Sequence, residues 1–528
     1  MIIIAVASFL VFLRGGGTAF LWPAIDMAPF FERHVNPNAL ANDFFASTSS
    51  LPNPRHVFGY VVIALNSLIG GHWYTAFFAL HIFLIILLPV LYFASISLIA
   101  RMYISKNHQL AQLLIALSVF IILFGRFQAI FSIAWWSPFF VQASPQTLSL
   151  FFGLLAIVLF ESSKPALVLS GYASFAGATL LQPAIGLFAV VFYIVLTIPF
   201  WHGMVWKWIA GVLFGWLLPA LILAIVFQSA ASLGTQEFIN IYVLNSHAPH
   251  YLLSHFGSLS SFPWYVSFGG ILVLMLVPLW FAVATRNRLL VAISTLSVLT
   301  YVGAVALQYI FISVLPSKLM AILGPVRFSQ FGYWLVVILW VIMLCETRWF
   351  TNRIVTLPNY LPVLRPRVFV LVAAILISVG VARIDRPYYD LYRHYETLYT
   401  FLATTPADSV VGVYHNKELM VNIPLLARRA IFTGNGFPFL EDAFREYDIR
   451  YTTLYGTLAQ QDAMAGISGG DNMTRFFRSL KPINFVEIAK QFRLDYIIVE
   501  RHHSQEFSAS RPLFESDKEL VFAVKDLR

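Results

Sequence analysis

The sequence predicts a polytopic α-helical membrane protein of about eleven transmembrane helices that ends in a small extracytoplasmic α/β domain. Of its 528 residues 59% are hydrophobic and only 11% are charged, with a mean hydropathy of +0.76. Soluble domains carry roughly 25% charged residues. The acids are also segregated, because 19 of the 25 lie from Asp385 onward. We therefore expect a membrane domain over residues 1–385, including a first outer loop 23–73, and a soluble domain over residues 386–528.

Apolar stretches long enough to approach the roughly 20 residues of a membrane span recur along the first part. They cover residues 2–22, 74–100, 109–125, 147–160, 166–181, 184–200, 206–227, 264–284, 289–313, 329–346 and 368–382. We interpret the first as a retained span and not as a signal peptide, because no basic region and no convincing cleavage site accompany it.

Basic residues in the connections predict the orientation of these spans. Ten of them gather in the short loops of one face: Arg101, Lys106, Lys164, Lys207, Arg286, Arg288, Arg348, Arg353, Arg365 and Arg367. The positive-inside rule makes that face cytoplasmic. The N-terminus is then cytoplasmic, and loops 23–73, 126–146, 228–263 and 314–328 lie outside together with the C-terminal domain.

The net charge of +9 does not indicate nucleic-acid binding. From Asp385 to the end 17 Lys and Arg residues face 19 Asp and Glu residues, so the excess belongs to the membrane part. There it indicates topology and contact with membrane lipid. The one cysteine, Cys345, cannot form an internal disulfide.

The sequence also predicts the structure of two regions outside the spans, the first outer loop and the C-terminal domain. The first outer loop is apolar but interrupted by four prolines, which favours short helices in the membrane interface. The C-terminal domain alternates candidate strands with candidate helices, which predicts a mainly parallel sheet. The strands expected are 409–414, 430–433, 496–500 and 520–524, and the helices are 418–428, 441–449 and 486–492.

Three acids in the first outer loop are the first candidates for chemistry. Asp26, Glu32 and Asp43 lie within 18 positions in a membrane domain that otherwise almost excludes carboxylates. A carboxylate beside hydrocarbon is costly and is therefore a functional candidate. It could act as a general base or as a metal ligand. The alternative for Asp43 is a helix cap, since Asn42-Asp43 directly precedes Phe44-Phe45.

Basic and aromatic residues in other outer loops are the second group of candidates. The residues are Arg126, Gln128, Trp135 and Trp136 in the second outer loop and Lys318 and Arg327 in the fourth. Arginine can clamp a phosphate through two hydrogen bonds, and tryptophan can present a platform to a sugar or an acyl chain. Interfacial anchoring is the alternative for the tryptophans. Three histidines of the third outer loop, His247, His250 and His255, have spacing that could suit a metal, but Pro249 interrupts them.

These features together resemble the GT-C superfamily of integral-membrane glycosyltransferases. The likeness rests on a first span, a long outer loop with the acid of Ala41-Asn42-Asp43-Phe44-Phe45 followed by Arg55, many further spans, a Gln-Pro-x-x-Gly-Leu break at residues 182–187, and an outward C-terminal domain. The sequence departs from the acidic doublet of some branches, because Asn42 stands beside Asp43. It also lacks an acid after Trp135-Trp136.

The resemblance implies transfer of a sugar from a polyprenyl-phosphate donor to an acceptor at the outer face of a bacterial cytoplasmic (inner) membrane, in cell-envelope glycan or glycolipid assembly. It implies that Asp43 is the base, Asp26 a second carboxylate, and Arg327 or Arg126 the phosphate clamp, with Arg55, Lys318, Gln128, Trp135 and Trp136 around the substrate. No cofactor is required by the sequence, and a divalent metal stays an open alternative. Two other functions also stay open: a transporter or flippase of lipid-linked sugars, and a non-catalytic envelope assembly protein.

Overall fold

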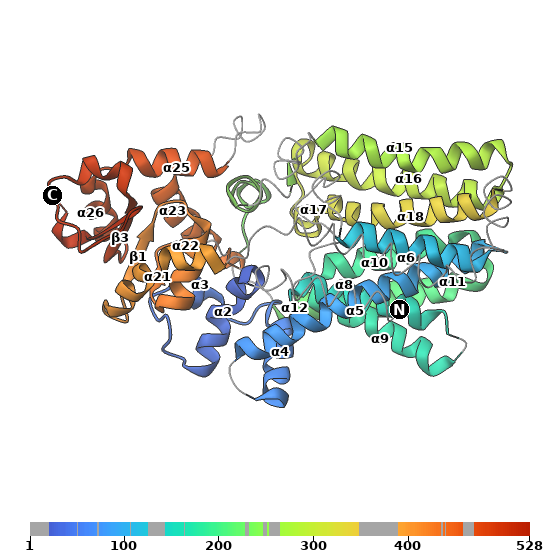
Figure 1. The fold of residues 1–528 in the computed structure, drawn as a ribbon, viewed down its shortest axis with the longest axis horizontal. Helices are drawn as coiled ribbons and strands as arrows, with labels where there is room; N and C mark the ends of the chain where they lie inside the picture. The colour runs from blue at the N-terminus through green and yellow to red at the C-terminus, as the bar shows by residue number, and fades with distance from the viewer. Residues whose placement is uncertain are drawn as a thin grey trace, which may run out of the picture. The chain divides into compact units, whose positions relative to one another are not determined.

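The computed structural model of the chain describes two compact units. They comprise residues 1–20, 77–226 and 249–387, and residues 21–76, 227–248 and 388–528. We call them the helical unit and the composite unit (Figure 1). The structure describes residues 21–49, 51–70, 73–105, 107–124, 143–162, 164–227, 232–246, 251–252, 264–347, 389–433, 437–438, 440–457 and 469–527.

The helical unit is a multi-pass bundle of apolar helices. In chain order they are α5 (Trp73–Tyr103, whose first turn belongs to the composite unit), α6 (His108–Phe124), α8 (Pro145–Phe160), α9 (Pro165–Leu181), α10 (Pro183–Thr197), α11 (Trp201–Ala210), α12 (Leu218–Val226), α15 (Trp264–Ala284), α16 (Arg288–Tyr309), α17 (Lys318–Leu323) and α18 (Ser329–Glu346). Five segments of the described chain are long and apolar enough to cross a membrane: Thr75–Tyr103, Pro183–Val226, Tyr265–Ala284, Arg288–Val314 and Lys318–Glu346. Figure 1 shows α15, α16 and α18 running side by side.

The segment Pro183–Val226 folds back on itself and accounts for two of the predicted spans. A short 3₁₀ turn, η2 (Ile198–Phe200), contains Pro199 and ends α10. On the way back Trp208 Nε1 donates to Thr197 Oγ1 at 2.9 Å, and Trp216 Nε1 donates to the Pro183 carbonyl at 3.1 Å. The returning arm of this hairpin includes a π-helical stretch, η3 (Gly211–Leu217).

The break between α9 and α10 follows from a proline and a close helix contact. Pro183 occupies the first position of α10, where its missing N–H costs nothing. A Cβ on Gly186 would lie 2.3 Å from Thr179 Oγ1 and 2.7 Å from Thr179 Cα. Gly186 therefore allows α10 to pack directly on α9, and the Gln-Pro-x-x-Gly-Leu pattern has a packing explanation here.

Hydrogen bonds at one end of the bundle show which helix ends lie together. Tyr103, the last residue of α5, donates through its hydroxyl to the Leu196 carbonyl near the end of α10. Asn107 Nδ2 donates to the Cys345 carbonyl at the end of α18 at 3.3 Å. These ends adjoin basic connections predicted to be cytoplasmic. The other end of α18 is about 26 Å away at 1.5 Å per residue, and Arg327 lies there.

The composite unit contains a five-stranded sheet in the order β2-β1-β3-β5-β4. The strands are β1 (Val410–Val413), β2 (Ala430–Ile431), β3 (Tyr496–Glu500), β4 (Phe514–Glu515) and β5 (Glu519–Ala523). Strand β1 pairs in parallel with β2 and β3, whereas β5 pairs antiparallel with β3 and β4. The expectation of a mainly parallel sheet is thus half right. After β3 the chain makes the short turn η10 (Arg501–Phe507) and returns without a crossover helix, which allows only antiparallel pairing.

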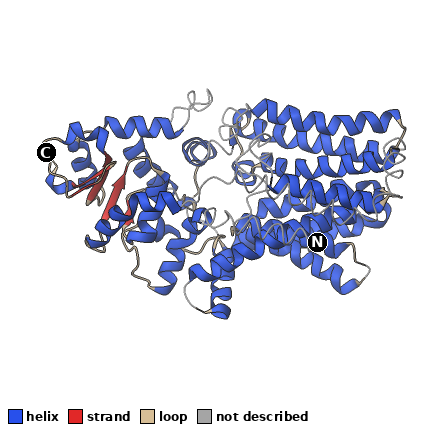
Figure 2. Ribbon diagram, in the orientation of Figure 1, coloured by secondary structure: helices blue, strands red, loops and turns tan. Residues whose placement is uncertain are grey.

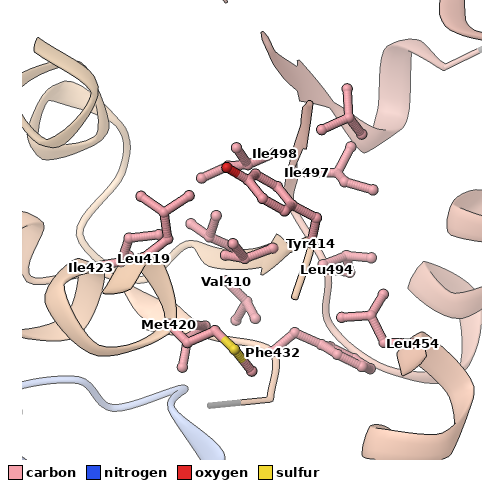
Figure 3. Close-up of a cluster of buried hydrophobic side chains, with 14 of the residues drawn as sticks. Val410, Tyr414, Leu419, Met420, Ile423, Phe432, Leu454, Leu494, Ile497 and Ile498 are labelled. Atoms are coloured by element: carbon pink, nitrogen blue, oxygen red, sulfur yellow. The ribbon is translucent and has the colours of Figure 1, made fainter. Parts of the chain in front are cut away.

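Helices cover this sheet and bury its apolar core. They are α21 (Tyr389–Thr404), α22 (Lys417–Asn422), η8 (Ile423–Ala427), η9 (Glu441–Ala443), α23 (Phe444–Tyr455), α25 (Gly469–Ser479) and α26 (Pro482–Gln491). Figure 3 shows Leu419 and Met420 of α22 beside Val410 of β1, in a buried cluster that also contains Ile497 and Ile498 of β3. The strands of the described chain all lie in this unit (Figure 2).

Two earlier segments of the chain complete the composite unit. Residues 21–76 supply α2 (Leu21–Val35), α3 (Phe44–Ser49) and α4 (His56–Ile69), and residues 227–248 supply α13 (Thr235–Phe238) and η4 (Ile239–Ser246). Glu237 forms a two-pronged ion pair with Arg445, at 2.7 and 3.0 Å. The Tyr242 ring stacks on Phe444. The domain boundary at residue 385 stays a prediction. In the structure, the composite unit is built from three segments that are distant in the sequence.

Candidate functional site

Asp43 is the N-cap of helix α3. Its Oδ1 accepts a hydrogen bond from the Ala46 N–H at 2.7 Å, and its carbonyl accepts from the Ser47 N–H at 2.9 Å. This is the geometry by which an aspartate satisfies a free N–H in the first turn of a helix. The capping alternative considered from the sequence is therefore present in the structure.

The second carboxylate oxygen of Asp43 bonds the C-terminal sheet. Oδ2 accepts from the Ile431 N–H of β2 at 2.9 Å. The side chain is 2% exposed. Burial raises the pKa of the Asp43 carboxyl, while the backbone N–H groups of Ile431, Ala46 and Phe45 and the nearby Arg33 act in the opposite direction.

Neighbours of Asp43 hold the same segment on the sheet. Asn42 Nδ2 donates to the Asp408 carbonyl at 2.6 Å. The Phe44 ring is buried in the C-terminal core. The Arg450 guanidinium lies 5.0 Å from the Phe44 ring centroid and 5.0 Å from that of Phe492, within the range of a cation–π interaction.

The other predicted residues of the first outer loop lie on separate elements. Asp26 is within helix α2, and Arg55 directly precedes α4, partly buried. Glu32 accepts a hydrogen bond from Trp73 Nε1 at 3.0 Å, and Phe31 stacks on the Trp73 ring. Glu32 thus ties α2 to the start of α5, which gives it a structural role.

Among the candidate residues of the helical unit, Arg327 has the most fully described surroundings. It lies in the 3₁₀ turn η7 (Pro325–Phe328) before α18, and it is 5% exposed. Its Nη2 donates to the Tyr251 hydroxyl at 2.6 Å, and its Cζ lies 5.2 Å from the centroid of that ring. The guanidinium is therefore positioned against an aromatic side chain, in a turn at the end of an apolar bundle.

The local sequence explains how this turn accommodates Arg327. Gly324 has φ of +59°, a left-handed conformation that favours glycine. A Cβ at Gly324 would lie 3.0 Å from Arg327 Nε, so glycine also leaves space for the guanidinium. Gln308 completes the arrangement, because its Nε2 donates to the Tyr251 carbonyl at 3.2 Å and its Oε1 accepts from the Val326 N–H at 3.4 Å.

Gln330 adds a polar group that the sequence did not single out. It is 5% exposed, three residues after Arg327, and its Nε2 is buried without a hydrogen-bond partner in the described chain. Residues three apart lie on the same face of a helical segment. A buried amide donor beside a buried guanidinium suits an anionic or carbonyl oxygen. A glutamine inside an apolar helix start was the signal available in the sequence.

Lys318 is the first residue of α17 and is partly buried, six residues before Gly324. Arg126, Gln128, Trp135, Trp136 and the three histidines of the third outer loop lie outside the described residues. Asp43 and Arg327 belong to different units. Among the described residues no group of three His, Cys, Asp or Glu side chains is arranged to hold a metal ion.

Comparisons with known proteins find structural similarity to solved proteins of the GT-C fold. One is the crystal structure of ArnT from Cupriavidus metallidurans in the apo state, at 10% sequence identity and a TM-score of 0.40, covering 99% of this chain and 97% of that chain. Another is the apo oligosaccharyltransferase of Archaeoglobus fulgidus, at 11% sequence identity and a TM-score of 0.44, covering 94% of this chain and 69% of that chain. No family model and no curated protein matches the sequence.

Proposed function

We propose that this chain is a membrane glycosyltransferase that moves a sugar from a polyprenyl-phosphate donor to an acceptor at the outer face of a bacterial inner membrane. Its role would be in cell-envelope glycan or glycolipid assembly. The N-terminus is then cytoplasmic and the C-terminal domain extracytoplasmic. Membrane lipid and the lipid-linked donor are its partners, and no metal is needed for the residue roles below.

The observation that carries this proposal is the buried guanidinium of Arg327. A charge held near hydrocarbon is costly and is usually retained for a substrate or ion. Arginine presents a planar set of donors that matches phosphate oxygens. The Tyr251 hydroxyl bonds it, and Gln330, three residues later, carries a buried amide nitrogen without a hydrogen-bond partner in the described chain. A phosphate bound at this end of the bundle would leave its prenyl chain among apolar helices.

The proposed reaction divides its work between Arg327 and a first-loop carboxylate. The acceptor hydroxyl oxygen forms a bond to the anomeric carbon of the sugar while the bond from that carbon to the phosphate oxygen breaks. Polyprenyl phosphate leaves with the electron pair, and Arg327 stabilises the charge that it gains. The hydroxyl proton passes to a carboxylate acting as general base, for which Asp26 and Asp43 are the candidates.

The test is a transfer assay in proteoliposomes with radiolabelled polyprenyl-phosphate sugars, run beside a translocation assay on the same vesicles. Arg327→Ala should lower kcat/KM for the donor about 100-fold or more, as loss of a transition-state donor does. Arg327→Lys should recover part of it, because lysine keeps the charge without the two-pronged geometry. Arg288→Ala, an exposed arginine at the start of α16, is the control and should leave transfer unchanged.

The alternatives predict different results. A transporter would move lipid-linked sugar across the vesicle membrane without transferring it. Equal activity of the Arg327→Ala and wild-type proteins would remove the phosphate-clamp role. Absence of both transfer and translocation with every donor would favour a non-catalytic assembly protein.

A further inference from the structure

Strand β2 lies at the open edge of the C-terminal sheet, and the first outer loop closes that edge. The strand has only two residues. It pairs with β1, and the N–H of the next residue, Phe432, donates to the Val411 carbonyl of β1 at 2.9 Å. The Ile431 N–H therefore points away from β1. An edge N–H of this kind needs a partner or a cover, and Asp43 Oδ2 provides it.

The same carboxylate also holds the helix that carries it. Because Oδ1 bonds Ala46 and Oδ2 bonds Ile431, one side chain links the first turn of α3 to the sheet edge. A general base must come within about 2.6–3.2 Å of the proton that it removes. Both carboxylate oxygens of Asp43 already accept backbone N–H groups, so neither is available to take a proton from a substrate hydroxyl while this segment is docked.

We propose that Asp43 is a positioning residue: it anchors the first outer loop to the edge of the C-terminal sheet, and Asp26 is then the remaining candidate for the proton acceptor of the proposed reaction. This inference rests on the proposed function for its catalytic part. Asp26 is the other aspartate of that loop and is carried on α2, and α2 packs against η8 of the C-terminal domain. Loosening the anchor would therefore displace α2, the helix that carries residue 26, without removing a reacting group.

The two acceptor oxygens make Asp43→Asn an informative variant. Asparagine caps a helix about as well as aspartate, so a simple cap would tolerate the change. An amide has only one acceptor oxygen, and its NH₂ group would face one of the two backbone N–H donors. The variant should therefore keep either the hydrogen bond to the Ala46 N–H, which caps α3, or the hydrogen bond to the Ile431 N–H of β2, but not both.

Hydrogen exchange of the full-length protein in nanodiscs measures the anchor without any activity. Asp43→Asn should raise the exchange rate of peptides covering 43–48 or 429–432 about 10- to 100-fold, the equivalent of one unsatisfied buried donor. The control is Glu237→Gln, which makes the same change of charge in the same unit and breaks the ion pair with Arg445. It should leave both peptides unchanged. Unchanged exchange in Asp43→Asn would overturn the anchor.

A cross-link distinguishes positioning from proton transfer. Asn42 and Asp408 are in contact, so Asn42→Cys and Asp408→Cys can be joined by a disulfide or a short bismaleimide in a Cys345→Ala background. Asp43→Asn should lower transfer at least about 10-fold, and the cross-link should restore most of it with an unchanged pH profile, whereas Asp26→Asn should stay inactive when cross-linked. A formed cross-link that restores nothing to Asp43→Asn would overturn the positioning role. If the wild type shows no transfer, the exchange result still decides the anchor, and only the proposed function fails.

Discussion

At the scale of single residues, Asp43 and Arg327 show two ways in which a buried ionisable group is held. Asp43 receives backbone N–H groups from two elements distant in sequence. Arg327 lies against a tyrosine ring and hydroxyl. The first arrangement fills the carboxylate oxygens with protein donors and is typical of a structural link. The second presents a guanidinium fork, whose planar donors suit a phosphate.

The raised pKa of Asp43 predicts how the stability of the composite unit depends on pH. An unfolded aspartate has a pKa of about 3.9, and burial raises the folded value. As pH rises between these values the unfolded chain loses its proton first, so the free energy of unfolding falls. Asp43→Asn cannot titrate at this position. The difference between the thermal midpoints of the wild type and Asp43→Asn should therefore become smaller as pH rises from the unfolded to the folded pKa of Asp43. A gap that widens would mean that the folded protein favours the ionised carboxylate.

Gly324 is predicted to be indispensable to the Arg327 turn for two separate reasons. Alanine there would hold a left-handed conformation at a cost of about 1–2 kcal/mol, and its Cβ would crowd Arg327 Nε. Gly324→Ala should lower the thermal midpoint and weaken use of the donor. Gly303→Ala is the matched control, because Gly303 lies within α16 and has open space where the alanine Cβ would lie. Equal effects of the two changes would contradict this explanation.

At the scale of elements, α4 is predicted to lie on the membrane surface. Its exposed side chains Tyr60, Val61 and Leu68 share one face, and Leu68 is 85% exposed. The helix ends at Ile69, four residues before α5 begins at Trp73. Four residues span at most about 14 Å, so the apolar face stays near the point where α5 enters the membrane.

Nitroxide labels can test the placement of α4. A label at Leu68→Cys should be more accessible to oxygen than to a water-soluble nickel complex, as in an acyl environment. A label at Asn38→Cys, exposed in the turn after α2, should show the reverse. The placement is wrong if both labels respond as in water.

Much of this element-level structure could be predicted from the sequence, and the failures have identifiable causes. Apolar runs placed the described helices of the bundle, and the runs 184–200 and 206–227 correspond to the two arms of one hairpin. Strand β3 was predicted with the observed bounds. Strand β4 was missed because its two residues are Phe514 and Glu515, which lack the short apolar run that indicated β2. Residues 2–20 of the first predicted span and the whole of the span 368–382 lie outside the described residues.

The candidate site was less predictable than the fold. The rarity of acids identified Asp43, and the residue types before Phe44 suggested the cap, but no local pattern could indicate Ile431 as its second partner. That bond joins distant parts of the chain and follows only from tertiary packing. Gln308 and Tyr251 were missed for the same reason, since each acts through a partner on another segment.

At the scale of the whole molecule, the composite unit restricts the topology. Its three segments are separated in the sequence by apolar helices, yet Glu237 bonds Arg445, and Asp43 bonds Ile431. A compact unit of this kind can lie on only one side of a membrane. The positive-inside rule had assigned loops 23–73 and 228–263 and the C-terminal domain to one side, and the packing supports that shared side. Which side it is stays a prediction.

Cysteine labelling in intact cells tests the predicted outward orientation. In a Cys345→Ala background, which keeps the backbone oxygen that Asn107 bonds, single cysteines replace the exposed residues Asn38 and Ser508 of the composite unit and Ser105 beside the basic connections. An impermeant maleimide should label Asn38→Cys and Ser508→Cys from outside, and Ser105→Cys only after permeabilisation, because the ten basic residues keep that face cytoplasmic. The inverse pattern would reverse the orientation and leave the composite unit intact. Labelling of Asn38→Cys and Ser508→Cys from opposite sides would contradict the composite unit itself, and with it the anchoring of the first outer loop by Asp43.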